Sequence, residues 1–289
     1  MKIGVMVESF RAGLNGGLAA AAEVGADGVQ LFATGGETHP DALNAQGRKD
    51  LLARVRDLGL EFSALCADFG GHGFQVAEEA PERIENSRKV VDLALDLGCS
   101  VITTHIGVIP TTDGPSADKA HPRYAVMART CEQLGRYADG KGATFAIETG
   151  PEPAVVLREF LDDIGLPGGM GVNFDPANLA MVTAEDIPAA VASLGRYIVH
   201  THAKDGVNLK PVDPEKLYGL FAGETHGGFN PDEYLREVPL GEGDVPFAEY
   251  ITALREVGFD GYLTIEREVG DDPRGDIELA VRFLRRLVN

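Results

Sequence analysis

The sequence predicts an α/β protein built as a single (β/α)8 barrel over residues 1–289. Three features indicate this fold: eight short apolar runs, amphipathic helical stretches between them, and helices that end at a glycine shortly before the next apolar run. Strands that alternate with helices pair in parallel through right-handed crossovers, and eight such units close a barrel. An open doubly wound sheet is the alternative, but it would leave the last strands without a phosphate-binding glycine loop to account for them.

Each predicted strand is a mainly apolar run, as expected for a parallel sheet buried on both faces. In chain order these strands are Ile3–Val7, Gly28–Phe32, Glu61–Ala67, Val101–Ile106, Thr144–Glu148, Met170–Asp175, Tyr197–Ala203 and Tyr262–Glu266. The helical stretches include Ala12–Val24, Leu51–Leu58, Glu82–Leu97, Arg123–Ala138, Ala154–Ile164, Phe247–Val257 and Ile277–Val288. Glycine adopts the left-handed conformation that closes a last helical turn, and it stands after four of these helices, at Gly25, Gly59, Gly98 and Gly258.

The longest stretch without a predicted element covers about residues 205–246, after the seventh strand. It holds two glycine-rich runs, Phe221–Gly228 and Pro239–Asp244. A loop of that length in a compact domain is typical of a functional lid, and its glycines would let it fold over a pocket. A decorative insertion is the alternative.

Composition and charge narrow the classes of partner. The formal charge is −19, from 26 basic and 45 acidic residues, and no cluster of Lys or Arg offers the basic face that DNA or RNA needs. The cysteines Cys66, Cys99 and Cys131 are far apart and form no CxxC pair, which fits a reducing compartment. Because no apolar run approaches the roughly 20 residues of a membrane helix and no signal-peptide pattern is present, we expect a cytoplasmic protein without a membrane partner.

Polar residues stand at the ends of the last four predicted strands: Glu148, Asp175, His202 and Glu266. All strands of a barrel end at one rim, where the chemistry of such enzymes occurs. Any one of these residues has a simple structural alternative, because a strand-terminal Asp is often a helix N-cap. Three carboxylates that converge would repel each other unless a cation held them together. The set therefore predicts one bound divalent metal ion, with Mn²⁺ favoured and Mg²⁺, Co²⁺ or Zn²⁺ open.

Other polar side chains near this rim are candidates for substrate contact, each with a structural alternative. His105 ends the fourth strand and could instead be a hydrogen-bonded structural histidine. Lys204 could bind a substrate oxyanion or pair with Asp205, and Arg267 could clamp the carboxylates. His200 points to the same side as His202 but deeper in the barrel, where we expect it to be packed. Two further candidates, each equally compatible with a solvated loop, are Glu8 and His72.

The strand ends and the residues after them resemble the xylose isomerase-like superfamily of sugar phosphate isomerases and epimerases, a group of TIM barrels. The resemblance runs over the whole chain and rests mainly on Ile147–Gly150 with Glu152, Asp175–Leu179, His202–Asp205, Pro239–Asp244 and Ile265–Glu268. It implies four metal ligands, which map onto the four strand-end residues. In the ketose 3-epimerases of this superfamily the two glutamate ligands also act as acid and base, which would make Glu148 and Glu266 catalytic.

The resemblance also shows a departure. Ketose 3-epimerases of this group usually carry a histidine three residues after the Asp ligand, and this chain has Asn178 there. Asn178 can hydrogen-bond a substrate hydroxyl but cannot titrate, which argues against an ordinary ketose 3-epimerase.

The sequence thus predicts a divalent-metal-dependent isomerase or epimerase of a sugar, keto-sugar or polyol, working by proton transfer through a metal-stabilised enediolate. A lyase is the main alternative, because the same enediolate can expel a hydroxyl, as in the inosose dehydratases of this superfamily. A phosphodiesterase like the AP endonucleases that share the fold, and a non-catalytic sugar-binding module, are less favoured. We expect a small-molecule carbohydrate partner, with substrate identity and homo-oligomerisation left open.

Overall fold

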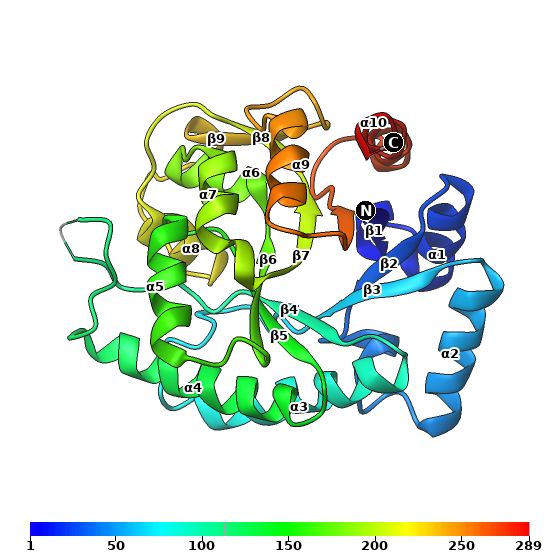
Figure 1. Ribbon diagram of the computed structural model, residues 1–289, viewed down its shortest axis with the longest axis horizontal. Coiled ribbons are helices and arrows are strands. Elements are labelled where there is room, and N and C mark those ends of the chain that lie inside the picture. The colour runs from blue at the N-terminus through cyan, green and yellow to red at the C-terminus, as the bar shows by residue number, and fades with distance from the viewer. Residues whose placement is uncertain (113, 289) are drawn as a thin grey trace.

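The computed structural model describes residues 1–112 and 114–288. Eight parallel strands close into a barrel in the order β1-β10-β7-β6-β5-β4-β3-β2 (Figure 1). This closure confirms the predicted barrel and excludes the open sheet. The barrel strands are β1 (Lys2–Met6), β2 (Gly28–Phe32), β3 (Glu61–Cys66), β4 (Val101–Thr104), β5 (Thr144–Glu148), β6 (Met170–Phe174), β7 (Ile198–Ala203) and β10 (Tyr262–Ile265).

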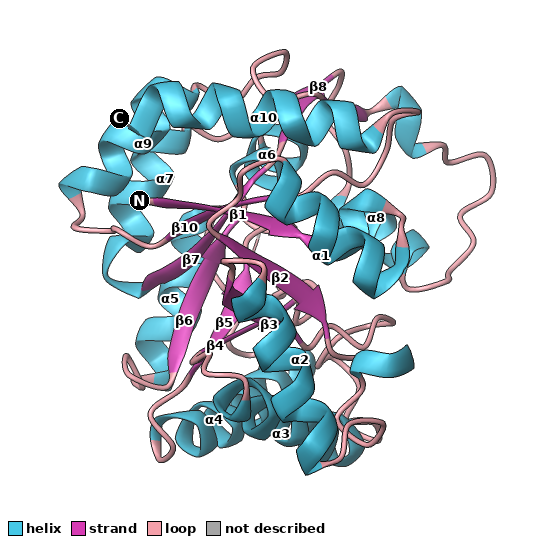
Figure 2. Ribbon diagram, turned by 90° about the vertical axis from the view of Figure 1, so that its right-hand side faces the viewer, coloured by secondary structure: helices cyan, strands magenta, loops and turns pink. Residues whose placement is uncertain are grey.

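Helices surround the strands, as the view in Figure 2 shows. The larger ones are α1 (Gly13–Glu23), α2 (Ala45–Asp57), α3 (Ala80–Asp96), α4 (Pro122–Asp139), α5 (Ala154–Ile164), α7 (Ile187–Leu194), α9 (Phe247–Glu256) and α10 (Pro273–Val288). Most ends lie within about two residues of the predicted ones, the usual uncertainty of a helix boundary. The exceptions are α2 and α10. The second helix starts six residues early because the Asn44 side chain accepts a hydrogen bond from Gly47 N and caps it. The last helix starts four residues early at Pro273, a residue that suits a first helical turn.

The predicted glycine junctions have the expected backbone. Each lies just past a helix with a positive φ, at 82° for Gly25, 74° for Gly59, 74° for Gly98 and 81° for Gly258. A side chain would strain this conformation, so glycine is what lets each helix turn back toward the next strand.

One barrel helix was not predicted. Helix α7 follows β6 after a short helix α6 (Pro176–Asn178) and a π-helical turn (Leu179–Thr183). Its start carries a local signal, because Asp186 accepts from Ala189 N at 2.9 Å and a proline follows two residues later. The helix is only eight residues long. Its apolar residues were therefore too few to show a helical period.

The sequence predicted no regular element between residues 205 and 246, and the structure corrects this prediction. This stretch forms a two-stranded antiparallel sheet, β8 (Asp205–Asn208) with β9 (Leu235–Val238), and a helix between them, α8 (Pro214–Phe221). Asp205 pairs with Val238, which is distant in sequence. Contacts over such a separation leave no local periodicity, so the hairpin is visible only in three dimensions.

The interior of the barrel contains polar side chains that later prove to contact the site residues. Several buried side chains inside the barrel are hydrophilic, in contrast to the aliphatic core between strands and helices: Gln30, Thr103, Asn173, His200 and Thr264. Buried polar groups need hydrogen-bond partners, and these are described below. Within the described part of the chain, no helix combines the length and apolar character that crossing a membrane requires.

Candidate metal centre and active site

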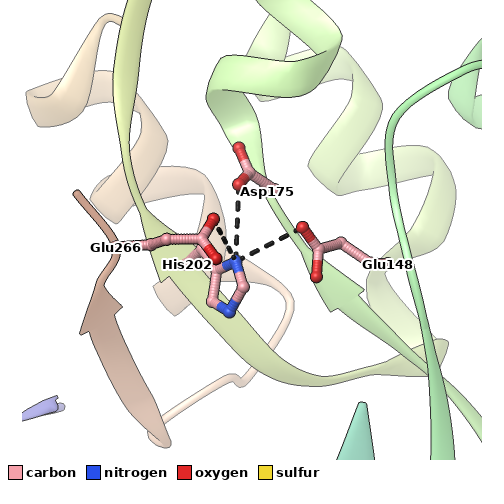
Figure 3. A group of neighbouring side chains, drawn as sticks. All are labelled: Glu148, Asp175, His202 and Glu266. Carbon is pink, nitrogen blue, oxygen red and sulfur yellow. Dashed lines mark ion pairs between the residues drawn. The ribbon is translucent and has the colours of Figure 1, made fainter. Parts of the chain in front are cut away.

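Four strand ends bring the predicted metal ligands together. Glu148 is the last residue of β5, Asp175 follows β6, His202 lies near the end of β7 and Glu266 follows β10. All four side chains are buried and point toward one another (Figure 3). Parallel strands that end at one rim create this convergence directly from the fold.

The distances suit a single ion. His202 Nδ1 lies 3.4 Å from Glu148 Oε1, 3.4 Å from Asp175 Oδ2 and 3.3 Å from Glu266 Oε2. One ligand atom from each of the four residues lies within 4.8 Å of the others. Ligands about 2.1 Å from one ion stand roughly 3.0 to 3.4 Å apart. Two of these atoms, Asp175 Oδ2 and His202 Nδ1, are buried without a hydrogen-bond partner among the described residues. The cluster could therefore hold one metal ion, and its donor set leaves the identity of the metal open.

The polar interior fixes the orientation of the histidine. Gln30 Nε2 donates to Thr103 Oγ1 at 2.9 Å, which turns Gln30 Oε1 toward His202 Nε2 at 3.2 Å. A proton on Nε2 is held by this amide oxygen, which leaves Nδ1 free to bind an ion placed between it and the carboxylates. Asn173 Nδ2 donates to Glu148 Oε2 at 3.0 Å and so holds that carboxylate. Asn173 Oδ1 in turn meets His200 Nδ1 at 2.8 Å, which agrees with the packed role expected for His200.

The charges of the cluster are strongly coupled. Burial alone would raise the pKa of Glu266, but Lys204 and His202 outweigh it and hold that pKa well below its usual value. Burial alone would lower the pKa of His202, but Glu148 and Glu266 raise it well above normal. The carboxylates therefore favour a positive charge at the position that His202 Nδ1 faces.

Two predicted substrate contacts touch the cluster itself. His105 Nε2 lies 3.6 Å from Glu148 Oε1, while its Nδ1 lies 3.1 Å from Asp68 Oδ2. Burial opposes the charged form, but Glu148 and Asp68 raise the pKa of His105 to about 10. Asn178 Nδ2 donates to Glu148 Oε1 at 3.3 Å and to Thr149 O at 3.2 Å. Both His105 and Asn178 therefore contact the Glu148 carboxylate in the protein without substrate.

Lys204 also meets the cluster, though not through the neighbour considered in the sequence. Its Nζ lies 3.1 Å from Glu266 Oε2 and also pairs with Glu268. Asp205 instead accepts backbone N–H groups at the base of the hairpin, from Gly206, Gly241, Gly243 and Val245. The pairing of Lys204 with Asp205 was therefore wrong, because successive residues of an extended chain point in opposite directions.

The remaining predicted contacts lie away from the metal ligands. Arg267 binds Glu237 of β9 at 2.5 Å and Asp276 of α10 at 2.8 Å, so it holds the hairpin rather than clamping the metal carboxylates. Glu8 Oε1 accepts from Phe32 N at 3.1 Å. His72 Nε2 lies 3.6 Å from Glu224 Oε1 at a cavity of about 310 Å³ beside α8.

Sequence reasoning missed several side chains around the metal ligands. Asn173 could have been found, because it lies two residues before Asp175 and so faces the same side of its strand. Gln30 is the polar residue of a strand that is otherwise mainly apolar, which is a weaker signal. Asp68 and Tyr218 gave no signal, because loops and the inserted helix place them. Glu152 belongs to the motif after β5 but was not predicted as a site residue; it is 3% exposed, and burial raises its pKa to about 8.

A comparison with known families agrees with this geometry. A family model described as the xylose isomerase-like TIM barrel matches residues 18–287. The chain belongs to the xylose isomerase-like TIM barrel family. No curated protein matches it significantly.

Solved structures place this family member among similar barrels. A xylose isomerase domain protein from Planctomyces limnophilus is 26% identical, with a TM-score of 0.77 over 99% of this chain and 96% of that one. A D-tagatose 3-epimerase-like protein is 21% identical, with a TM-score of 0.72 over 100% and 98% of the two chains. The probable 3-DHS dehydratase AsbF from Bacillus anthracis is 19% identical, with a TM-score of 0.70 over 99% of each chain. Because their identities are 21% and 19%, the last two similarities show only a shared fold.

Proposed function

We propose that this protein is a divalent-metal-dependent isomerase or epimerase of a sugar, keto-sugar or related polyol. The observation that best supports the proposal is the buried cluster of Glu148, Asp175, His202 and Glu266. Its two glutamates come from β5 and β10, which are separated in the barrel by β6 and β7. In Figure 3 they lie on opposite sides of His202. A carbon atom held between them could lose a proton to one carboxylate and regain one from the other.

Glu148, Asp175, His202 and Glu266 would hold the ion. When bound, it would act as a Lewis acid on the substrate carbonyl and make the neighbouring C–H acidic. This help is needed, because a carboxylate with a depressed pKa, such as Glu266, is a weak base.

The surrounding residues keep the two glutamates in place. Asn173 and Asn178 donate to the two oxygens of Glu148, and Lys204 donates to Glu266. These bonds fix the direction in which each carboxylate presents its lone pairs. His105 Nε2, which lies 3.6 Å from Glu148 Oε1, could donate to a substrate oxygen on the same side.

A lyase is the second candidate. The specific observation that favours it is Glu152, whose buried carboxyl has a pKa raised to about 8 and so carries a proton at neutral pH. A dehydratase needs an acid for the departing hydroxyl, and Glu152 could supply that proton. One of the similar folds is described as a probable 3-DHS dehydratase.

The proposal is tested by incubating the Mn²⁺-loaded protein with ketoses and inososes in D₂O and following C–H exchange by NMR. Glu148→Gln and Glu266→Gln should each retain a bound metal and lose at least about a hundredfold in kcat, the usual scale for a general base. Glu249→Gln, at an exposed position of α9, is the matched control. Near-normal turnover in both variants, or no exchange with any substrate, would contradict the proposal. Exchange accompanied by loss of water would select the lyase.

A further inference from the structure

Helix α8, inserted between β8 and β9, brings a neutral hydroxyl beside the chain that follows Glu148. Tyr218 lies on this helix, and its ring centroid is 6.1 Å from that of His105. A Cβ at position 150 would collide with Tyr218 Oη, so the hydroxyl rests on the backbone two residues after Glu148. Glycine is needed at position 150 because it has no side chain to block this close approach, and not because of its backbone conformation.

The hydroxyl of Tyr218 stays protonated. Burial first, and then the negative charges of Glu152 and Glu148, raise its pKa well above the usual value. Tyr218 therefore offers a hydrogen-bond donor without a positive charge.

The cationic side chains that contact the cluster are already paired. In the described residues these are Lys204 and His105. Lys204 faces Glu266 and Glu268, and His105 faces Asp68 and Glu148. An incoming anion would have to compete with two carboxylates for each cation.

The charge balance remains negative when an ion is bound. Three ligand carboxylates and the two partners Asp68 and Glu268 face two cationic side chains and a divalent ion. This leaves a net negative charge even with Glu152 counted as neutral and His105 as charged. A substrate phosphate or carboxylate would enter this field at a cost, whereas a hydroxyl would not.

The cations that hold the inserted segment, residues 205–246, are engaged in the same way. Arg123, which lines the cavity beside α8, binds Glu215 of that helix. Arg267 binds Glu237 of β9. Either guanidinium would have to release the insertion before it could bind an anion.

We infer that this site selects an uncharged polyhydroxy substrate, with Tyr218 of the inserted helix donating a hydrogen bond to one of its hydroxyls. The inference rests on the proposed function and specifies its substrate class. It excludes phosphorylated sugars and carboxylate-bearing cyclic ketones as good ligands.

Binding to the Mn²⁺-loaded protein, measured by calorimetry and by thermal shift, tests the inference without relying on turnover. The neutral probes are xylitol and D-allulose, and the anionic probes are D-fructose 6-phosphate and 3-dehydroshikimate. We expect the neutral probes to bind at least about tenfold more tightly. Equal or tighter binding of an anionic probe, or no binding of the neutral probes, would overturn the inference.

Two variants examine the residues that carry it. Tyr218→Phe removes only the hydroxyl and should weaken binding of the neutral probes about five- to tenfold while leaving the unliganded melting temperature unchanged. Its control is Phe221→Leu, at a 64% exposed position of the same helix. Glu268→Gln removes one partner of Lys204 and should strengthen binding of the anionic probes several-fold, whereas Glu233→Gln, which releases Lys210 instead, should not. Unchanged affinities in both Tyr218→Phe and Glu268→Gln would count against the inference.

The outcomes separate the inference from the proposed function. C–H exchange in D₂O with a sugar phosphate but not with neutral ketoses would leave the isomerase proposal standing and refute the substrate class. Tight binding of neutral probes without exchange in any of them would refute the isomerase proposal and leave the substrate class standing.

Discussion

Glu152 makes a sharp prediction about stability and pH. Its carboxyl is 3% exposed, and the backbone donors that face it are Ile109 N, at 3.5 Å, and its own N–H. Burial raises its pKa from 4.5 to about 8. The unfolded chain therefore loses this proton at a much lower pH than the folded protein does, and ionisation of Glu152 opposes folding.

The sign and size of the effect follow from these two values. Below pH 4.5 both states carry the proton and Glu152 contributes nothing. Between pH 4.5 and pH 8 the free energy of unfolding falls by about 1.4 kcal/mol per pH unit, and above pH 8 the loss is constant at no more than about 5 kcal/mol. Glu152→Gln keeps an acceptor for Ile109 N but does not ionise. It should stabilise the protein by less than about 1 kcal/mol at pH 5 and by up to roughly 3 kcal/mol at pH 7.

Thermal unfolding of the metal-free protein, in EDTA at pH 5, 6, 7 and 8, measures this difference. The gain at pH 7 corresponds to about 5 °C in Tm for a chain of this size. Glu249→Gln, at an exposed position of α9, is the control and should show no such trend. A Tm difference between Glu152→Gln and the parent protein that does not grow from pH 5 to pH 8 would refute the reasoning.

Three further predictions concern the metal, Asn178 and Asp205. Chelation should lower both activity and Tm through lost ligand linkage, and Mn²⁺ or Co²⁺ should restore them; full activity after exhaustive dialysis against EDTA, with no metal by elemental analysis, would contradict the metal site. A side chain that only binds a substrate hydroxyl would, on change to Ala, mainly raise KM. Because Asn178 also donates to Glu148, we expect Asn178→Ala to lower kcat about tenfold as well, measured by steady-state kinetics; a change in KM alone would show that Asn178 acts in substrate binding only. Asp205→Asn replaces one of two oxygens that together accept four backbone N–H groups and should lower the free energy of unfolding by about 2 kcal/mol in a urea titration. An unchanged midpoint would show that the hairpin base does not depend on that acceptor.

The sequence by itself determined the barrel and the four residues that could hold a metal. Strand and helix periods are local properties, so eight apolar runs and their glycine junctions revealed the order of elements. Once the fold is a barrel, each strand end must lie on the same rim, and Glu148, Asp175, His202 and Glu266 follow without any knowledge of distances. Burial of His200 followed from the same alternation of side chains.

Only the tertiary structure decided which side chains meet across the chain. The antiparallel hairpin pairs Asp205 with Val238. Lys204 forms ion pairs with Glu266 and Glu268, and Asp68 contacts His105. None of these contacts repeats with a helical or strand period, because each joins segments whose separation depends on the closed barrel and its insertion. Tyr218 illustrates the limit most clearly: no helix was predicted between residues 205 and 246, and only the packing of α8 against Gly150 places its hydroxyl beside the chain that follows Glu148.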